Sequence, residues 1–391
     1  MKIAMIARKM NVRGGVQRHV LSLAKELKAR GHDLTIYTFS YKADDCYPDL
    51  LKGMHVVSLD GKPPRWRFGI WSLMDEYTAA KRLALLIDRE TEILNPDHAT
   101  YRVAYYYKKL VKNIPSVWMM HDMPTKRYSG MREGASHGHA LFLRRMMNIL
   151  YDWYERYRFI RMQDVIMVHS DGDAKRVKKS FARDAVVVRS GIDPAYFSFH
   201  KRDPPTKSRI KILMNGIFLP HRRFEDGIEA VSMLKKAGYG VHLSIIGDYD
   251  FDRSYYRALQ ALVRERGVDR EVMFLGRVSE EELLHQYHAN NIFLFPNHLQ
   301  SWGLAVFEAI ASGMPTVVSK TAGAAEVLVD KENALLVNPK DPEEITGAVR
   351  RLTENPDEYR RLSGNGRAFV EKNLSWAVLA DQMERIFLPP H

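Results

Sequence analysis

The chain has 391 residues, of which 46% are hydrophobic, and it carries a formal net charge of +12. This length and composition suit two globular domains and exclude a disordered or fibrous protein. The single cysteine, Cys46, excludes an intramolecular disulfide framework and a cysteine-rich zinc site, so a reducing cytoplasm is the expected compartment. The net positive charge favours an acidic partner. Charge alone does not distinguish nucleic acid, an anionic membrane and a phosphorylated substrate.

The chain opens with the pattern of a βαβ unit. Residues 2–7 form an apolar run typical of a buried parallel strand, and a glycine-containing loop separates it from an amphipathic stretch over 16–30. Residues 33–39 form the next predicted strand, which makes a right-handed unit at the start of a doubly wound domain. We predict that this domain spans residues 1–195, with further strands over 55–59, 92–94, 116–120, 165–169 and 185–189.

A second α/β series follows a break in composition. Residues 198–208 are polar and contain two adjacent prolines, which is typical of a linker. A second doubly wound domain is predicted over 205–373. If two such domains face each other, a cleft lies between the carboxyl ends of their strands, where ligands of these sheets bind. The strands of the second domain are predicted over 211–215, 241–247, 272–275, 292–295, 316–319 and 334–337.

Residues 300–315 have the pattern of a loop that enters a short helix, which Gly313 and Pro315 end. A helix N-terminus preceded by glycine favours an anion, because its free N–H groups and its dipole both attract negative charge; here we expect a nucleotide diphosphate. Glu308 lies about one turn into this helix, so its carboxylate can reach back and accept two hydrogen bonds from a ribose. A solvated helix glutamate is disfavoured because the neighbouring residues are apolar.

Seven segments, taken in order, resemble the retaining nucleotide-sugar glycosyltransferases of the GT-B fold, in the family 4 type also called glycosyl transferases group 1. Each segment is weak alone, and their shared order along the chain is specific. The resemblance implies two Rossmann-like domains, an acceptor-binding one at the N-terminus and a nucleotide-sugar-binding one at the C-terminus. It also implies that a helix over 374–391 packs back on the first domain. The segments are 13–20, 119–124, 189–193, 216–223, 245–248, 274–278 and 300–326.

The resemblance also implies an activity. A hexose would move with retention from a UDP- or GDP-sugar to a hydroxyl of a glycan or lipid-linked acceptor, without a metal or other cofactor. In the first domain Gly14 and Gly15 would let the backbone approach the donor diphosphate, although a plain glycine turn is the alternative. The residues assigned to the donor or nucleotide are Gly14, Gly15, Gly216, Arg277, Val278, Ser301, Gly303, Leu304 and Glu308.

Two departures from the family pattern fall on residues with chemical roles. The family usually has an arginine after the strand glycine and a lysine five residues later, which neutralise the leaving diphosphate. Here Ile217 stands at the arginine position and Arg222 at the lysine position, so we predict that Arg223 supplies the second cation; solvated surface arginines are the alternative. Gln300 replaces a glutamate, and an amide can bind sugar hydroxyls but cannot be a nucleophile or base. This favours departure and attack on one face of the sugar, with the diphosphate helping to deprotonate the acceptor.

Polar residues at two strand ends of the first domain are candidates for binding the sugar and the acceptor. His121 follows an apolar strand, and by the resemblance it contacts the transferred sugar; a structural histidine is the alternative. Asp97 and His98 end the preceding strand and could orient an acceptor hydroxyl and take up its proton, although a turn after a proline explains them equally well. In the second domain, Asp248 and Asp250 match the strand-end glycine–aspartate of this fold, so we predict no metal site there.

Residues 101–162 hold twelve basic residues against four acidic ones, with aromatic residues among them. A helix of this composition suits an anionic lipid surface, so we predict peripheral docking on the inner face of the cytoplasmic membrane. The alternative is a helix with one buried face and solvated arginines. Nucleic acid is disfavoured because no DNA- or RNA-binding motif accompanies the charge, and no apolar run approaches the roughly 18 residues of a spanning helix.

Two other functions stay open on the sequence. A non-catalytic nucleotide-sugar or glycan-binding module is suggested by Gln300 and Ile217. An epimerase or a phosphorylase could use the same architecture, since a fold does not fix a function.

Overall fold

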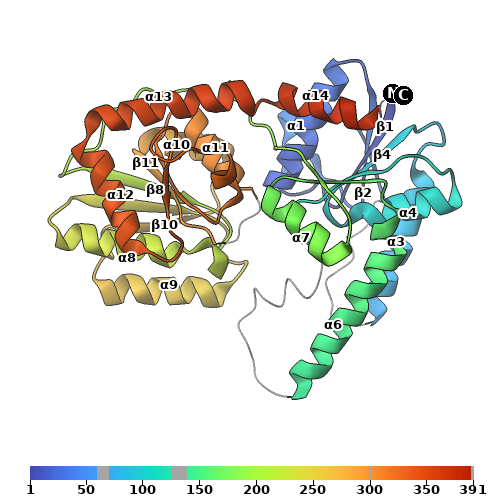
Figure 1. Ribbon diagram of the computed structural model, residues 1–391, viewed down its shortest axis with the longest axis horizontal. Helices are drawn as coiled ribbons and strands as arrows, with labels where there is room; N and C mark the ends of the chain where they lie inside the picture. Colours follow the sequence, from blue (N-terminus) through green and yellow to red (C-terminus); the bar gives the residue numbers. More distant parts are fainter. Residues whose placement is uncertain (60–69, 125–138, 299–301, 389–391) are drawn as a thin grey trace. The chain divides into compact units, whose positions relative to one another are not determined.

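The structure is a computed structural model, and it describes residues 1–59, 70–124, 139–298 and 302–388. The chain divides into two compact units (Figure 1). The first unit comprises Met1–Gly191 and Trp376–His391, and the second comprises Ile192–Ser375. Each unit is built on a parallel sheet with helices on both faces.

The sheet of the first unit has the strand order of a Rossmann domain. Its strands run in the order β3-β2-β1-β4, and single bridges from Leu94 to Ser116 and from Asp97 to Met119 continue the sheet into β5-β6-β7. The strands are β1 (Lys2–Ala7), β2 (Asp33–Thr38), β3 (His55–Ser58), β4 (Ile93–Pro96), β5 (Val117–Met119), β6 (Val165–Val168) and β7 (Val186–Val187). The helices are α1 (Gly15–Ala29), α2 (Pro48–Leu51), α3 (Ile70–Leu86), α4 (Tyr101–Leu110), α6 (His139–Arg158), α7 (Asp171–Phe181) and α14 (Trp376–Phe387).

Alternation along β1 separates two apolar cores. Ile3 and Met5 pack with α1 and α14 on one face of the sheet, while Ala4 and Ile6 pack with α3 and α4 on the other. The last helix, α14, lies beside α1 (Figure 1) and buries Trp376 in the same core. The C-terminal segment therefore belongs to the first unit although the whole second unit precedes it in sequence.

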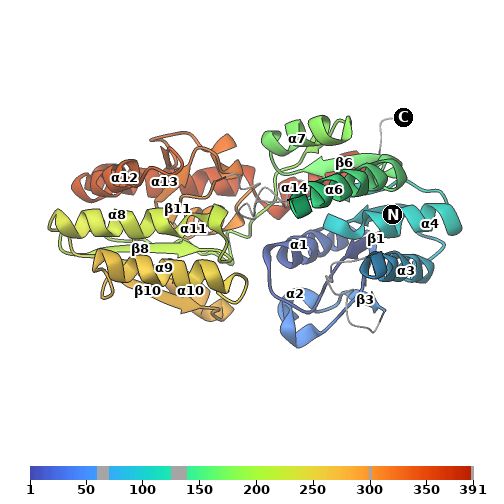
Figure 2. The same ribbon diagram turned by 90° about the horizontal axis from the view of Figure 1, so that it is seen from below.

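The second unit repeats the same strand order. All its neighbouring strands pair in parallel, in the order β10-β9-β8-β11-β12-β13. The helices α12 and α13 lie side by side (Figure 2). The strands are β8 (Ile210–Asn215), β9 (Val241–Ile246), β10 (Val272–Gly276), β11 (Ile292–Phe295), β12 (Thr316–Ser319) and β13 (Leu335–Val337). The helices are α8 (Phe224–Lys236), α9 (Arg253–Arg266), α10 (Glu280–Ala289), α11 (Leu304–Ala311), α12 (Pro342–Glu354) and α13 (Pro356–Asn373).

The two doubly wound domains predicted from the sequence are confirmed. The linker-like segment 198–208 belongs to the second unit and is bonded to its neighbouring segments. Arg202 in this segment donates to the carbonyl oxygens of Asn290 at 3.0 Å and Ser312 at 2.7 Å. A proline-rich composition cannot reveal such contacts, since the acceptors are main-chain groups that any sequence supplies.

Candidate active site

The chain enters α11 through a glycine that no other residue could replace without strain. Gly303 has φ 97°, and a Cβ there would lie 2.8 Å from the Phe295 ring at the end of β11. No side chain among the described residues caps this helix. Its first-turn N–H groups therefore meet the requirement for an anion site, and Leu304 is the first residue of the helix. Gln300 and Ser301 lie outside the described residues.

Glu308 is buried on α11, with 7% of its surface exposed. The Tyr287 hydroxyl from α10 donates a hydrogen bond to Glu308 Oε2 at 2.7 Å, and the Asn215 amide at the end of β8 donates to the Tyr287 oxygen at 3.3 Å. Burial of a carboxylate is costly unless polar groups surround it. This chain of donors holds the carboxylate in one orientation near the start of α11.

Arg222 follows β8 in the turn Pro220–Arg222, and Asn297 after β11 holds it in place. With its amide oriented to satisfy both groups, Asn297 accepts from Arg222 Nη1 at 2.8 Å and donates to the Arg222 carbonyl at 3.1 Å. The Arg222 side chain lies next to Gly216, where a Cβ would be in van der Waals contact with Arg222 Cδ at 3.4 Å. Close backbone packing also fixes this strand end, since a Cβ on Gly247 would lie 1.8 Å from the Gly216 carbonyl oxygen.

The contacts of Arg223 do not support its predicted role as the second cation. Its guanidinium pairs with Glu225 at 2.6 Å and with the buried Asp226 at 2.5 Å, both in the first turn of α8. Two carboxylates already neutralise this charge. Arg223 therefore stabilises the start of α8, and a diphosphate would have to compete with these ion pairs for it.

Arg277 and Val278 follow β10 at the same edge of the sheet. Arg277 is exposed and pairs with Asp248, which follows β9, at 2.5 Å. Val278 is half-buried and packs on the apolar core beneath α10 and α11. Gly216, Arg222, Arg277, Val278 and Glu308 thus all lie near the carboxyl ends of parallel strands within one unit, where ligands of such sheets bind.

In the first unit, Gly14 precedes α1 and Gly15 begins it, after the carboxyl end of β1. The Gln17 side chain donates to the Lys9 carbonyl at 3.0 Å, and a Cβ on Gly14 would lie 2.8 Å from Gln17 Oε1. No acidic residue occupies the first turn of α1. The glycine loop therefore brings main-chain groups to the strand end, next to an uncapped helix N-terminus.

His121 and Asp97 meet at the carboxyl ends of β5 and β4. His121 Nε2 lies 2.5 Å from Asp97 Oδ1, and His121 Nδ1 lies 2.8 Å from Nε2 of His169, which follows β6. His121 Nδ1 is therefore bonded to a protein group, while Nε2 faces Asp97 without an aligned hydrogen bond. The contact of this ring with the transferred sugar stays a prediction.

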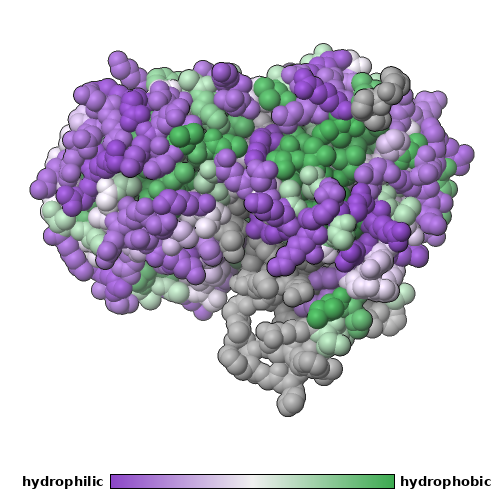
Figure 3. Space-filling view, viewed as in Figure 1, coloured by the Kyte–Doolittle hydropathy of each residue, from purple (hydrophilic) through white to green (hydrophobic). Residues whose placement is uncertain are grey.

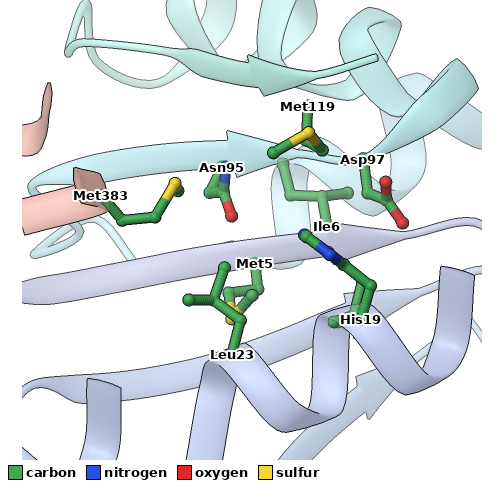
Figure 4. A pocket seen from close by; sticks show the side chains of 9 residues that line it. Met5, Ile6, His19, Leu23, Asn95, Asp97, Met119 and Met383 are labelled. Atoms are coloured by element: carbon green, nitrogen blue, oxygen red, sulfur yellow. The ribbon is translucent and has the colours of Figure 1, made fainter. Parts of the chain in front are cut away.

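His98 adopts a left-handed backbone, with φ 47°, and its carbonyl accepts from the Trp118 indole at 2.7 Å. Burial lowers the pKa of the His98 imidazole, so the ring is neutral near pH 7. Figure 4 shows His19 from α1 and Asp97 pointing toward one small pocket, which is otherwise lined mainly by apolar side chains. The three polar residues of that lining are His19, Asn95 and Asp97.

Several residues with clear structural roles at these sites were missed from the sequence. Tyr287 orients Glu308, Asn297 holds Arg222, and His169 contacts His121. The position of Asn297 and His169 directly after buried strands was an available signal, because strand ends carry the ligands in this class of sheet. Tyr287 lies in a helix with ordinary amphipathic spacing and gave no such signal.

Both sheets have the Rossmann strand order, and the polar residues lie at their carboxyl edges, as in enzymes that bind nucleotides. Family models match nearly the whole chain: "Glycosyltransferase Family 4" over residues 13–196 and "Glycosyl transferases group 1" over 197–369. The chain belongs to the group 1 glycosyltransferases of the GT-B fold.

Individual relatives are distant but match along their length. The glycogen synthase of Mycobacterium tuberculosis is 25% identical over 96% of this chain and 91% of its own. The human alpha-1,3/1,6-mannosyltransferase ALG2 is 24% identical over 95% of this chain and 92% of its own. Among solved structures, Anabaena HepE in complex with UDP and glucose superimposes with a TM-score of 0.75 at 16% identity, covering 99% of both chains. The likeness to HepE shows a shared fold, while the two sequence relatives bear the names of different enzymes.

Proposed function

We propose that this glycosyltransferase moves a hexose from a UDP- or GDP-sugar to a hydroxyl of a glycan or lipid-linked acceptor in cell-surface polysaccharide or glycolipid synthesis. The observation that carries the proposal is the buried Glu308 carboxylate, which Tyr287 orients near the uncapped start of α11. A carboxylate so placed suits the two hydroxyls of a ribose, and the helix start suits the diphosphate. The bound UDP in the HepE structure supports a nucleotide donor.

Arg222 would neutralise the charge that develops on the leaving diphosphate, because a positioned guanidinium is most effective where charge appears in the transition state. We further propose that the sugar is transferred with retention and without a covalent intermediate on Gln300, whose amide is no nucleophile. The diphosphate oxygen would then accept the acceptor proton on the face from which it departs. No step in this scheme requires a metal or other cofactor.

A panel of UDP- and GDP-sugars, monitored by mass spectrometry for hydrolysis and transfer, tests this function. We expect release of nucleoside diphosphate from one donor class, and NMR of the product should show the anomeric configuration of the donor. The Glu308→Ala variant is the control for contaminating activity. Tight donor binding without turnover by the wild type would favour a binding module. Conversion of the donor into an isomer of equal mass, seen by NMR without release of nucleoside diphosphate, would favour an epimerase.

We propose that α6 docks this enzyme on an anionic membrane at the inner face of the cytoplasmic membrane. Met146, Leu150, Trp153 and Tyr157 recur at helical spacing and are all exposed, and Figure 3 shows apolar surface where Figure 1 places this helix. The Arg156 guanidinium lies over the Tyr157 ring, so a cation borders the apolar stripe. Apolar side chains bordered by arginines are what a headgroup boundary accepts.

The proposed docking surface is smaller than the region that the sequence indicated over residues 101–162. Arg102 is buried and pairs with Glu76 and with Glu155, each at 2.9 Å, and Tyr105 and Tyr107 lie in apolar cores. Arg102 anchors the end of α6 through Glu155, and none of these three buried side chains is placed to reach lipid. Within the part of the chain that the structure describes, no helix is both long and apolar enough to cross a membrane.

Replacing both Leu150 and Trp153 by serine should reduce binding to vesicles of anionic phospholipid at least about tenfold, because each buried apolar side chain contributes roughly 1.5–3 kcal/mol. Vesicle flotation at low salt measures this. The matched control is Met273→Ser, which removes an exposed apolar side chain of β10 in the other unit and should leave flotation unchanged. Equal flotation of the double variant and the wild type would reject α6 as the docking element.

A further inference from the structure

Three histidines from three parts of the first unit meet at the carboxyl end of its sheet; His19 and His169 are buried, and His121 is partly exposed. His19 comes from α1, His121 follows β5 and His169 follows β6, and their ring centroids lie 4.8 to 5.3 Å apart. Asp97 at the end of β4 contacts this cluster through His121. Imidazoles this close cannot all carry a positive charge, so the positions of their protons are constrained.

The acceptors of the cluster determine where the protons lie. His169 Nδ1 is 3.0 Å from the Val188 carbonyl oxygen, which can only accept, so that nitrogen carries a hydrogen and donates it. Burial, together with the neighbouring His121 charge, lowers the pKa of His169 to about 3, so its ring is neutral and Nε2 is an acceptor. The 2.8 Å contact then requires a hydrogen on His121 Nδ1.

The second nitrogen of His121 also carries a hydrogen. Its Nε2 lies 2.5 Å from Asp97 Oδ1, an ion-pair contact that is not aligned as a hydrogen bond, and a lone pair on that nitrogen would repel the carboxylate at this distance. A hydrogen on each ring nitrogen makes His121 an imidazolium that faces the Asp97 carboxyl group.

The surrounding charges agree with this state. Burial opposes the charge on His121, but the Asp97 carboxylate, with help from Asp122, raises the pKa of His121 above its ordinary value. Burial lowers the pKa of His19 well below the ordinary value, so this ring faces the cation as a neutral group and bonds Ser190 Oγ at 2.8 Å. The other groups that face the cluster are His98, which is neutral, and Arg189 beside His169.

We propose that His121 is a positioning residue that acts through Asp97, and that its imidazolium holds the carboxylate ionised and oriented at the end of β4 for the acceptor hydroxyl. This rests on the proposed transfer of a sugar to a hydroxyl. Because the pKa of His121 is raised, the ion pair is complete below the ordinary pKa of histidine and is lost as pH rises through the raised pKa of His121. Sugar transfer should therefore fall on the alkaline side as that proton leaves.

The proton positions can be measured without any activity. Long-range ¹H–¹⁵N correlation spectra of the full-length protein labelled with ¹⁵N-histidine should show two protonated nitrogens in His121 near neutral pH and a hydrogen on Nδ1 alone in His169. Signals are assigned with the His121→Gln and His169→Gln variants. A neutral His121 at pH 7 would overturn the proposal, whatever the enzyme is found to transfer.

The pH profile of transfer then tests the role. The Asp97→Asn variant removes the counter-charge, so the pKa of His121 and the alkaline limb of kcat should both move down by about one unit or more. His169→Gln keeps an acceptor for the hydrogen on His121 Nδ1, so kcat should fall at the same alkaline pH as in the wild type. His169→Leu removes that acceptor, so kcat should fall at a lower pH. A structural role alone would lower activity at every pH without moving the limb, and that result would also overturn the proposal.

Discussion

Replacing Glu308 by alanine should lower kcat/KM for the sugar donor by about a hundredfold to a thousandfold. The carboxylate can accept two hydrogen bonds from the ribose, and a hydrogen bond to a charged group contributes about 1.5–3 kcal/mol. Steady-state kinetics at several donor concentrations measures the loss. Because a ribose contact is made in both the bound and the transition state, much of the effect should fall on KM.

The neighbouring tyrosine provides a graded control for this experiment. Tyr287→Phe removes the hydroxyl that donates to Glu308 at 2.7 Å but leaves the carboxylate in place, so we expect a loss of roughly tenfold. The double variant should be no worse than Glu308→Ala, because the tyrosine acts on the donor only through that carboxylate. A wild-type KM in Glu308→Ala, with an unchanged melting temperature, would show that the ribose is bound elsewhere.

The fold could be predicted from the sequence because its signals are local. The strand predicted over 211–215 differs from the observed Ile210–Asn215 by one residue, since buried parallel strands are short apolar runs between helices. The family motifs likewise placed Glu308 and Arg222 at strand ends or helix starts. Such positions depend on the order of elements along the chain, which a sequence shows directly.

The protonation state and the bonding partners of the histidines depend on contacts between segments that are distant in sequence. His19 bonds Ser190 and His121 contacts Asp97 only because α1 begins, and β4, β5 and β7 end, at one edge of the sheet. No spacing in the sequence indicates which of these groups holds a proton. The ion pairs of Arg223, in contrast, are local in sequence, because their carboxylates lie two and three residues later at the start of a helix. Acidic residues in the first turn of a helix are a local signal in the sequence. They could have predicted that Arg223 pairs with carboxylates rather than with a diphosphate.

Arg222 and Arg223 are adjacent in sequence and should respond to substitution in opposite ways. Arg222→Met should lower kcat about a hundredfold to a thousandfold, as does removal of a single group that stabilises transition-state charge. Arg223→Met should instead lower the melting temperature, because it leaves the buried Asp226 carboxylate without its guanidinium partner. Thermal unfolding and kcat, measured on both variants, separate the two effects.

The Arg222→Lys variant tests whether charge or shape matters at this position. A lysine keeps the positive charge but cannot reproduce both the diphosphate contact and the bond from Arg222 Nη1 to Asn297, so we expect a kcat within about tenfold of the wild type. Asn297→Ala keeps the arginine but removes the amide that hydrogen-bonds to it. Its loss of kcat should lie between the losses of Arg222→Lys and Arg222→Met. If Arg222→Met kept the wild-type kcat while Arg223→Met lost it, the leaving-group charge would be met by Arg223, and the ion pairs to Glu225 and Asp226 would have to open during turnover.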